Sequence, residues 1–294
     1  GRKDMIKNKI VYTATHQRSS RIIVTVLMAA FAVGMVIPFI WMLSSSFKTA
    51  NEVMQLPIKW IPNSFDLRNY KIVWNIGDLA PRNYQFVNAY INSIVVAVIT
   101  VVSTLLTSSL AGYAFAKMEF KGRNILFLIY LATMMIPSSV TLIPKFVIFE
   151  QIGFIGTLLP IIIPRMVSVT GTFFMRQHYM EIPNEIKEAA IVDGAGEFKI
   201  WLRVMLPMTK PAFASLGVLA FLWNWNNYDE ALVFLTRSEC YTIPIALNNF
   251  IEEVSTQYNL IMAAAVSALI PVFIVFVLFQ KQLIVGLTAG AVKG

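Results

Sequence analysis

Six apolar runs alternate with polar connections along the 294-residue chain. A run of about 20 apolar residues is long enough for a helix to cross the roughly 30 Å hydrocarbon layer of a bilayer. We therefore predict an all-α integral membrane protein with six transmembrane helices. The runs that define these helices are 22–43, 91–113, 125–143, 157–174, 212–226 and 260–279.

Composition and charge agree with this class. Hydrophobic residues make up 57% of the chain and charged residues 14%, whereas soluble domains carry about 25% charged residues. With the N-terminus inside, the four inner segments carry 16 Lys and Arg and the three outer segments carry 7. Because Lys and Arg concentrate in cytoplasmic loops, both tails (1–21 and 280–294) and the loop 176–211 are predicted to be cytoplasmic, and 22–279 to form the membrane domain. No basic run interleaved with aromatics indicates a nucleic-acid partner.

Pro137, Pro160 and Pro164 lie inside the predicted third and fourth spans. A proline removes a helix hydrogen bond, which a membrane helix tolerates only where neighbouring groups compensate. These prolines therefore indicate either bent helices packed on other protein or scattered kinks without a functional role.

The polar stretch 180–211 has the most regular spacing of small, acidic and turn residues. Pro183 suits the first turn of a helix, and Glu185 in that turn meets the positive end of the helix dipole. Ala189 and Ala190 follow at positions expected to share one face with Ile186. Gly194 is placed to end this helix in a left-handed conformation. We predict a short helix over 183–193.

A second amphipathic piece follows after a tight turn. Its apolar stripe is expected to contain Phe198, Trp201, Leu202 and Met205, with charged residues on the other side. Pro207 and Pro211 close the stretch. The pattern predicts two short helices at a membrane surface.

This spacing resembles the EAA loop of ABC-importer permeases. That loop has Glu-Ala-Ala, then Gly, an aliphatic residue and Leu-Pro at fixed intervals, which here are Glu188-Ala189-Ala190, Gly194, Val204 and Leu206-Pro207. Val204 stands where the family usually has Ile, a conservative change in an apolar position. The other reading is a generic amphipathic cytoplasmic loop.

Other stretches resemble the carbohydrate-uptake branch of these permeases, the six-span maltose type. They are Pro38 to Lys48, Asn92-Ser93, Ala111 to Ala114, Phe120 to Arg123, Trp225-Asn226 and Gly286 to Gly294. The resemblance covers nearly the whole chain apart from its first twenty residues. It implies the type I ABC-importer permease fold and one half of a two-permease pore for a sugar or oligosaccharide.

The resemblance also implies which residues couple the pore to an ATPase. The helix 183–193 would be the coupling helix, seated in a groove of the ATPase, where Ala189 and Ala190 allow close approach. Glu188 is a candidate for a charge-assisted bond to a basic residue, and Asp193 either caps the turn or the next helix or contacts the ATPase. The tail ending in Lys293-Gly294 would reach toward the ATPase pair. The expected coupling residues are Glu185, Glu188, Ala189, Ala190, Asp193, Gly194, Leu206 and Pro207.

The end of the fifth run is rich in aromatic and amide side chains, at Trp223, Asn224, Trp225 and Asn226. Aromatic faces stack on sugars, and amides donate to and accept from hydroxyls, so these residues are candidates for the substrate path. The alternative is an interfacial belt, where Trp and Tyr collect in any membrane protein.

Arg165 lies about nine residues into the fourth run, which places it roughly 14 Å deep. A charge at that depth normally faces the protein interior or a water-filled path. Arg165 is therefore expected to line the substrate cavity, in which case an acidic sugar is a possible substrate, or to pair with an acid of the partner permease. The alternative is a bent helix that lets Arg165 reach a polar surface.

Several motifs are missing from the sequence. It lacks the G-x-x-x-x-G-K-[ST] phosphate loop, and its two histidines, His16 and His178, belong to no nucleophilic or metal cluster. We therefore expect no enzymatic activity, no cofactor and no metal in this chain, with ATP and Mg bound by partner ATPase subunits.

The implied partners are a second homologous permease, two cytoplasmic ATPase subunits and an extracellular or periplasmic solute-binding protein. The implied location is the cytoplasmic (inner) membrane of a bacterium or archaeon. An ion-coupled secondary transporter is the alternative function, and it predicts membrane-buried carboxylates and inverted repeats. No Asp or Glu lies within the six runs, which counts against it. A structural membrane scaffold would leave the coupling loop unexplained.

Overall fold

The computed structural model describes residues 2–78 and 85–289, with side chains described for 21–78 and 85–283. Every regular element in these ranges is helical. The chain divides into two compact units. Unit 1 comprises Gly1–Ile72 and Val254–Val266, and unit 2 comprises Val73–Glu253 and Ser267–Gly294. The end of the predicted C-terminal tail, 290–294, lies outside the described residues.

Unit 1 is built on the long helix α1 (Arg2–Ser45), which continues the helix through the predicted N-terminal tail. Its part Arg21–Ser45 is long and apolar enough to cross a membrane. The segment after α1 contains the short helices α2 (Ala50–Val53) and α3 (Arg68–Val73). The buried amide of Asn69 holds this segment in place, because its Nδ2 donates to the carbonyl oxygens of Ser46 and Lys48, both at 2.8 Å.

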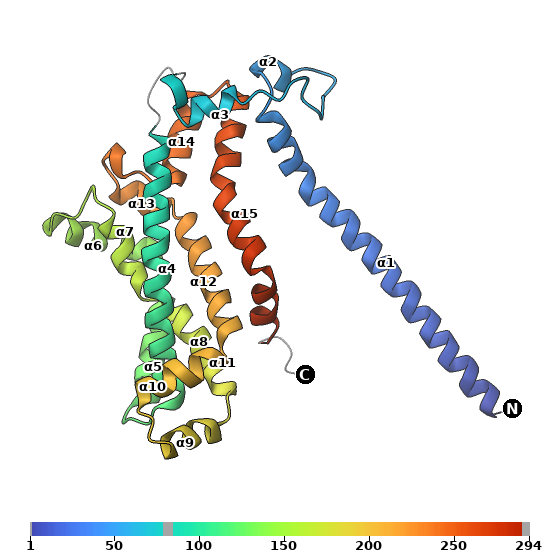
Figure 1. The fold of residues 1–294 in the computed structure, drawn as a ribbon, viewed down its shortest axis with the longest axis vertical. Helices are drawn as coiled ribbons and strands as arrows, with labels where there is room; N and C mark the ends of the chain where they lie inside the picture. Colours follow the sequence, from blue (N-terminus) through green and yellow to red (C-terminus); the bar gives the residue numbers. More distant parts are fainter. Residues whose placement is uncertain (1, 79–84, 290–294) are drawn as a thin grey trace. The chain divides into compact units, whose positions relative to one another are not determined.

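Unit 2 is organised around α4 (Phe86–Lys117), a 32-residue helix that packs along α8 (Val169–Glu181) and α12 (Lys210–Trp225) (Figure 1). Gly112 permits the close approach of α4 and α8. A Cβ at this position would lie 2.8 Å from Met175 Cβ and 2.9 Å from the backbone nitrogen of Arg176. Small residues at such crossings allow membrane helices to pack backbone to backbone.

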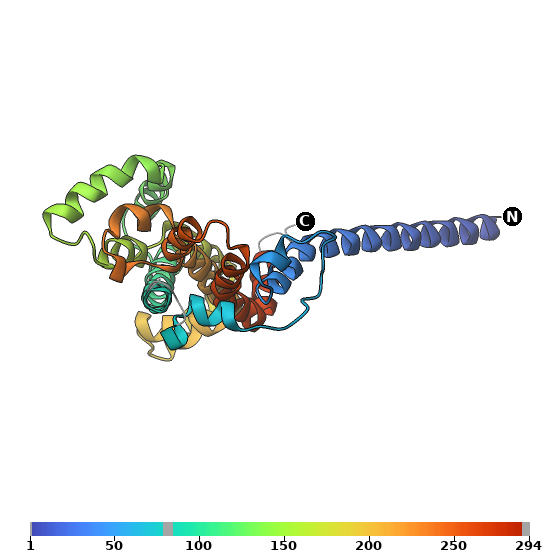
Figure 2. The same ribbon diagram turned by 90° about the horizontal axis from the view of Figure 1, so that it is seen from above.

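The predicted third span, 125–143, is not one straight helix. Helix α5 (Arg123–Ala132) and the 3-10 turn η2 (Thr133–Met135) end before Pro137, and α6 (Ser138–Gln151) leaves at an angle of 93°. In Figure 2, α6 (light green) lies to the side of the bundle formed by α4 and α12. Pro137 adopts an extended conformation that ends the first helix and starts the second.

The predicted fourth span, 157–174, is also broken. It consists of α7 (Leu159–Ile162), the 3-10 turn η3 (Ile163–Met166), two extended residues and then α8. The hydroxyls of Thr104 and Thr107 on α4 donate to the carbonyl oxygens of Arg165 and Met166 at 2.7 and 2.8 Å. These bonds satisfy backbone groups that the break releases, which is how irregular backbone becomes tolerable inside a membrane protein.

Within the described residues, three helices are long and apolar enough to cross a membrane, or five if each strongly bent pair counts as one span. The three are Arg21–Ser45, Phe86–Lys117 and Tyr258–Leu283, and the second bent pair joins 197–208 to α12 at 84°. The remaining elements are η1 (Ile76–Asp78), α9 (Asn184–Val192), α10 (Glu197–Ile200), the π-helical turn η4 (Trp201–Met205), α11 (Leu206–Met208), α13 (Asp229–Phe234), η5 (Ser238–Cys240), α14 (Ile243–Glu253) and α15 (Tyr258–Ala289).

Candidate functional site

The predicted short helix is present as α9, which begins directly after Pro183 and ends at Val192. Gly194 has a φ of 76°, and its backbone nitrogen donates to the Ile191 carbonyl oxygen at 2.9 Å. The helix and its left-handed glycine end are therefore confirmed. Asp193 occupies the C-cap position, where its backbone N–H donates to the Ala189 carbonyl oxygen.

The two alanines of the motif do not share a face. Ala190 packs with Ile186 against the core around Trp201, whereas Ala189 is exposed. Consecutive helix residues point about 100° apart, and here Ala190 lies on the core side of α9 while Ala189 lies on the outer side. Ala190 thus packs partly within this chain, and the contact of both alanines with an ATPase stays a prediction.

The exposed side of α9 instead presents positions spaced i, i+3, i+4 and i+7. We call this side the knuckle face, and it consists of Glu185, Glu188, Ala189 and Val192. Val192 is 87% exposed, and the adjacent Ile191 is 50% exposed. Apolar side chains this open at the tip of a loop are typical of a contact surface. Val192 is not among the coupling residues expected from the sequence, although its position one turn after Ala189 was the available signal.

Ammonium groups join α9 to the end of α4. Lys117 Nζ donates to the Ile182 carbonyl oxygen at 2.5 Å and to Asn184 Oδ1 at 2.6 Å, at the start of α9. Lys187 Nζ, from the middle of α9, donates to the carbonyl oxygen of Lys117 at 2.6 Å. The helix is thus attached to α4 at two points.

Glu197 adds a third attachment. One of its carboxylate oxygens lies 2.8 Å from Lys187 Nζ, and the other accepts a short hydrogen bond from the Tyr113 hydroxyl. We call Tyr113, Lys117, Lys187 and Glu197 the loop brace. It connects α4, α9 and α10 through side chains that sequence reasoning did not single out, because they come from separate elements.

The second amphipathic piece differs from its predicted stripe. Trp201 and Met205 are buried as expected, but Phe198 is 65% exposed and Leu202 is 45% exposed. Ile200 is buried instead, because residues 201–205 form a π-helical turn, which has wider spacing than the α-helix assumed.

Two polar side chains anchor this piece to the core. Trp201 Nε1 donates to Ser109 Oγ at 2.9 Å, and Ser109 Oγ also lies 2.6 Å from the Tyr179 hydroxyl. Leu206 packs against the same cluster, while Pro207 is exposed in the first turn of α11.

Arg165 is paired with an acidic side chain of its own chain. Its Nη2 and Nε lie 2.9 and 3.1 Å from Glu230 Oε2, and Lys145 Nζ lies 3.0 Å from Glu230 Oε1. Burial raises the pKa of the Glu230 carboxyl, but the charges of Arg165 and Lys145 and their hydrogen bonds outweigh it, so the pKa lies below its ordinary value. This charge cluster joins η3, α6 and α13.

Glu230 lies in the polar connection between the fifth and sixth apolar runs, where solvated side chains are the rule, yet its side chain is only 15% exposed. Arg165 was expected within one continuous span, 157–174. The structure breaks this span at Val167–Ser168, two residues after Arg165. The partner of Arg165 could not be found from the sequence without knowing where that span breaks.

The four candidate path residues on α12 fall into two groups. Trp225 is 3% exposed and its Nε1 donates to the Ala268 carbonyl oxygen at 3.1 Å, so it belongs to the core. Asn224 donates to the Ala220 carbonyl oxygen within its own helix and is partly buried. Trp223 and Asn226 are exposed, and Arg165 Nη1 lies 3.3 Å from the Trp223 carbonyl oxygen. Trp223 and Asn226 therefore remain available to a ligand, and Trp225 does not.

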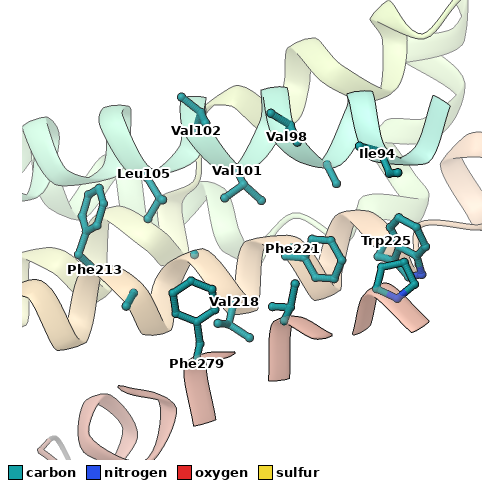
Figure 3. Close-up of a pocket in the computed structure, with 15 residues that line it drawn as sticks. Ile94, Val98, Val101, Val102, Leu105, Phe213, Val218, Phe221, Trp225 and Phe279 are labelled. Carbon is teal, nitrogen blue, oxygen red and sulfur yellow. The ribbon is translucent and has the colours of Figure 1, made fainter. Parts of the chain in front are cut away.

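A cavity of about 420 Å³ lies between α4, α12 and α15. Figure 3 shows Leu105 and Phe213 at one end and Ile94 and Trp225 at the other. Apart from the Trp225 ring nitrogen, which is already bonded, its lining side chains are hydrocarbon. A sugar placed there would leave its hydroxyls without partners, at a high free-energy cost. The cavity is therefore not a sugar site.

Among the described residues, no group of three or more His, Cys, Asp or Glu side chains is arranged to hold a metal ion.

Comparison with known proteins identifies relatives along the whole chain. The family described as "Binding-protein-dependent transport system inner membrane component" matches residues 105–286, more than half of the chain. The chain is 34% identical to the arabinooligosaccharides transport system permease protein AraQ of Bacillus subtilis, over 93% of this chain and 96% of that protein. It is 30% identical to the melibiose/raffinose/stachyose import permease protein MelC of the same organism, over 96% and 99%.

A solved structure is similar as well. It is a chain of a bacterial ABC transporter involved in the import of the acidic polysaccharide alginate. The TM-score is 0.77 and the identity 27%, covering 90% of this chain and 96% of that one.

Proposed function

Because this chain belongs to the family of binding-protein-dependent transport system inner membrane components, we propose that it forms one half of the pore of an ATP-driven oligosaccharide importer. Members of this family are membrane permease subunits and not enzymes, as expected from the sequence. The observation that carries the proposal is α9, a small exposed helix fixed to the longest helix of unit 2 and presenting the knuckle face.

The proposed substrate is a neutral oligosaccharide. The relatives above are named for arabinooligosaccharides and for melibiose, raffinose and stachyose, whereas the similar structure imports an acidic polysaccharide. In this chain Glu230 binds both Arg165 and Lys145 and cancels one of their two positive charges, which weakens the attraction of this cluster for an acidic sugar. Trp223 and Asn226 supply an exposed ring and an exposed amide, groups that suit hydroxylated ligands.

The proposed ATPase contact is the knuckle face. Glu188 would bond to a basic residue of the ATPase, Ala189 would allow close approach, and Val192 would be buried on contact. Glu185 and Asp193 lie at the edges of this contact. Gly194 would shape the turn, and Leu206 and Pro207 would set where the loop returns to the membrane.

The proposed assembly contains a second homologous permease, two ATPase subunits that bind ATP and Mg, and a solute-binding protein on the opposite side of the membrane. Both termini and the loop 176–211 would be cytoplasmic, in the inner membrane of a bacterium or archaeon. The absence of a phosphate loop from the sequence supports placing ATP on partner chains.

A charge reversal on the knuckle face tests the proposal. In Glu188→Arg, the ATPase subunits should no longer co-purify in detergent and oligosaccharide uptake into cells should be lost. Glu119→Arg, an exposed reversal in the turn after α4, is the matched control and should keep both. Uptake that survives Glu188→Arg, or that needs an ion gradient instead of ATP, would contradict the proposal.

A further inference from the structure

The chain on either side of α9 allows this helix to pivot. It is joined to α8 through Ile182 and Pro183, and to α10 through a four-residue link that contains Gly194 and Gly196. The two glycines leave the backbone of the second link free to rotate, so this link does not fix the orientation of α9, which depends on the packing of Ile186 and Ala190 and on polar side chains. A force applied to α9 would be lost in these links unless side chains hold the helix.

We propose that Lys187 and Glu197 are positioning residues that make α9 and α4 move as one body, so that a push on the knuckle face reaches the membrane. This inference rests on the function proposed above and concerns residues outside the EAA motif.

Lys187 makes the central contacts of the loop brace. Its ammonium group donates to the Lys117 carbonyl oxygen on α4 at 2.6 Å and pairs with Glu197 Oε1 on α10 at 2.8 Å. The side chain is 13% exposed, so water competes little for these bonds. The hydroxyl of Tyr113, one turn before Lys117 on α4, holds the other oxygen of Glu197. One side chain therefore connects three elements and bridges the glycine-containing link between α9 and α10.

Helix α4 extends from this brace to the broken segment of the membrane domain. The close contact at Gly112 makes α4 and α8 a single packed pair. Thr104, which lies about 20 Å from Lys117 along α4, donates to the carbonyl oxygen of Arg165. A displacement of α9 transmitted through Lys187 would thus reach the charge cluster at Glu230 without passing through the glycine link.

The first test measures the brace itself and requires no substrate. Spin labels are placed at Ile191→Cys on α9, which lies outside the knuckle face, and at Leu106→Cys on α4, both exposed, in a Cys240→Ser background of the assembled complex. We expect a narrow distance distribution with and without ATP, and a broad one after Lys187→Met. Lys199→Met, an exposed lysine on α10, is the control and should leave the distribution narrow. An equally narrow distribution in Lys187→Met would overturn the inference.

The second test measures coupling in vesicles that contain the complete importer and its binding protein, with labelled raffinose and arabinotriose as probes. Lys187→Met should lower the sugar imported per ATP hydrolysed by about fivefold or more, the range of an energetic coupling between sites. Glu197→Gln, whose side chain is 42% exposed and tolerant of change, should lower it in the same direction.

A merely structural role would act on assembly and not on this ratio. ATPase subunits should therefore co-purify with both variants in wild-type amounts. An unchanged ratio in both variants, or loss of the ATPase subunits from both, would overturn the positioning role and leave the proposed function standing. A wild-type complex that lacks ATPase subunits would instead overturn the proposed function.

Discussion

Glu197 and Glu230 each hold separate elements of unit 2 together, in different ways. Glu230 binds two cations, Arg165 and Lys145, and only 15% of its side chain is exposed. Glu197 binds one cation and one phenol, Lys187 and Tyr113, and its side chain is 42% exposed. The first cluster joins three elements by charge where water is scarce. In the second, water reaches the carboxylate of Glu197, whereas Lys187 is only 13% exposed.

The two carboxylates therefore have different roles, one in the stability of the fold and one in the orientation of a helix. Loss of a carboxylate that binds two partly buried cations destabilises the fold, because the two positive charges are then left close together without their carboxylate. At the loop, stability comes from packing and neutral hydrogen bonds around Gly112, Ser109 and Trp201. Glu197 therefore determines the orientation of α9 more than it determines stability. Substitutions at three positions test this contrast.

The largest effect is expected at the charge cluster. Glu230→Gln leaves Arg165 and Lys145 without their carboxylate and should lower the free energy of unfolding by about 3 kcal/mol, the lower end for breaking a buried pair. Thermal unfolding in detergent would measure this loss. Glu239→Gln, at an exposed position, is the control and should change stability by less than about 0.5 kcal/mol. Equal melting temperatures for the two variants would show that charge does not hold this region.

An intermediate effect is expected where packing holds the loop end of α4. Gly112→Ala places a methyl group 2.8 Å from Met175 Cβ and 2.9 Å from backbone, and should cost about 2 kcal/mol through overpacking. The same unfolding assay applies. Gly34→Ala on α1, where no atom lies within 4 Å, should be neutral or stabilise by up to about 1 kcal/mol. If Gly112→Ala were as stable as Gly34→Ala, the close contact of α4 and α8 would not be as described.

The smallest effect is expected at the turn after α9. Gly194→Ala forces a side chain into a φ of 76° and should cost about 1 kcal/mol. Hydrogen exchange of the α9 amides should therefore become about fivefold faster. Gly196→Ala, at a φ of −74° with no atom within 4 Å, is the matched control. Equal exchange rates in both variants would mean that the left-handed turn does not stabilise this helix.

Local patterns predicted the elements whose structure depends on local sequence. The long apolar runs 22–43, 91–113 and 260–279 lie within single helices that can cross a membrane, and Gly194 ends α9 as the spacing indicated. In each case the deciding physics lies within a few turns of chain. Apolar length selects a membrane helix, and an absent Cβ selects a left-handed turn.

Features that depend on distant residues were not predicted. The break at 167–168 is stabilised by hydroxyls of Thr104 and Thr107, about sixty residues earlier in the chain. The inward orientation of Ala190 depends on the core around Trp201, and the pairing of Arg165 depends on where α13 lies. The apolar pattern of a segment does not indicate which distant hydroxyl will donate to a backbone carbonyl oxygen that has lost its helical partner.

Val192 has a consequence for how cells produce this chain. Its side chain and that of Ile191 place hydrocarbon in water at the tip of a loop, which favours aggregation of any copy that has not met its ATPase. Surplus copies would be substrates for chaperones and proteases, which act on exposed apolar segments. We therefore expect the steady-state amount of this subunit to follow the supply of its neighbours and not the strength of its own promoter.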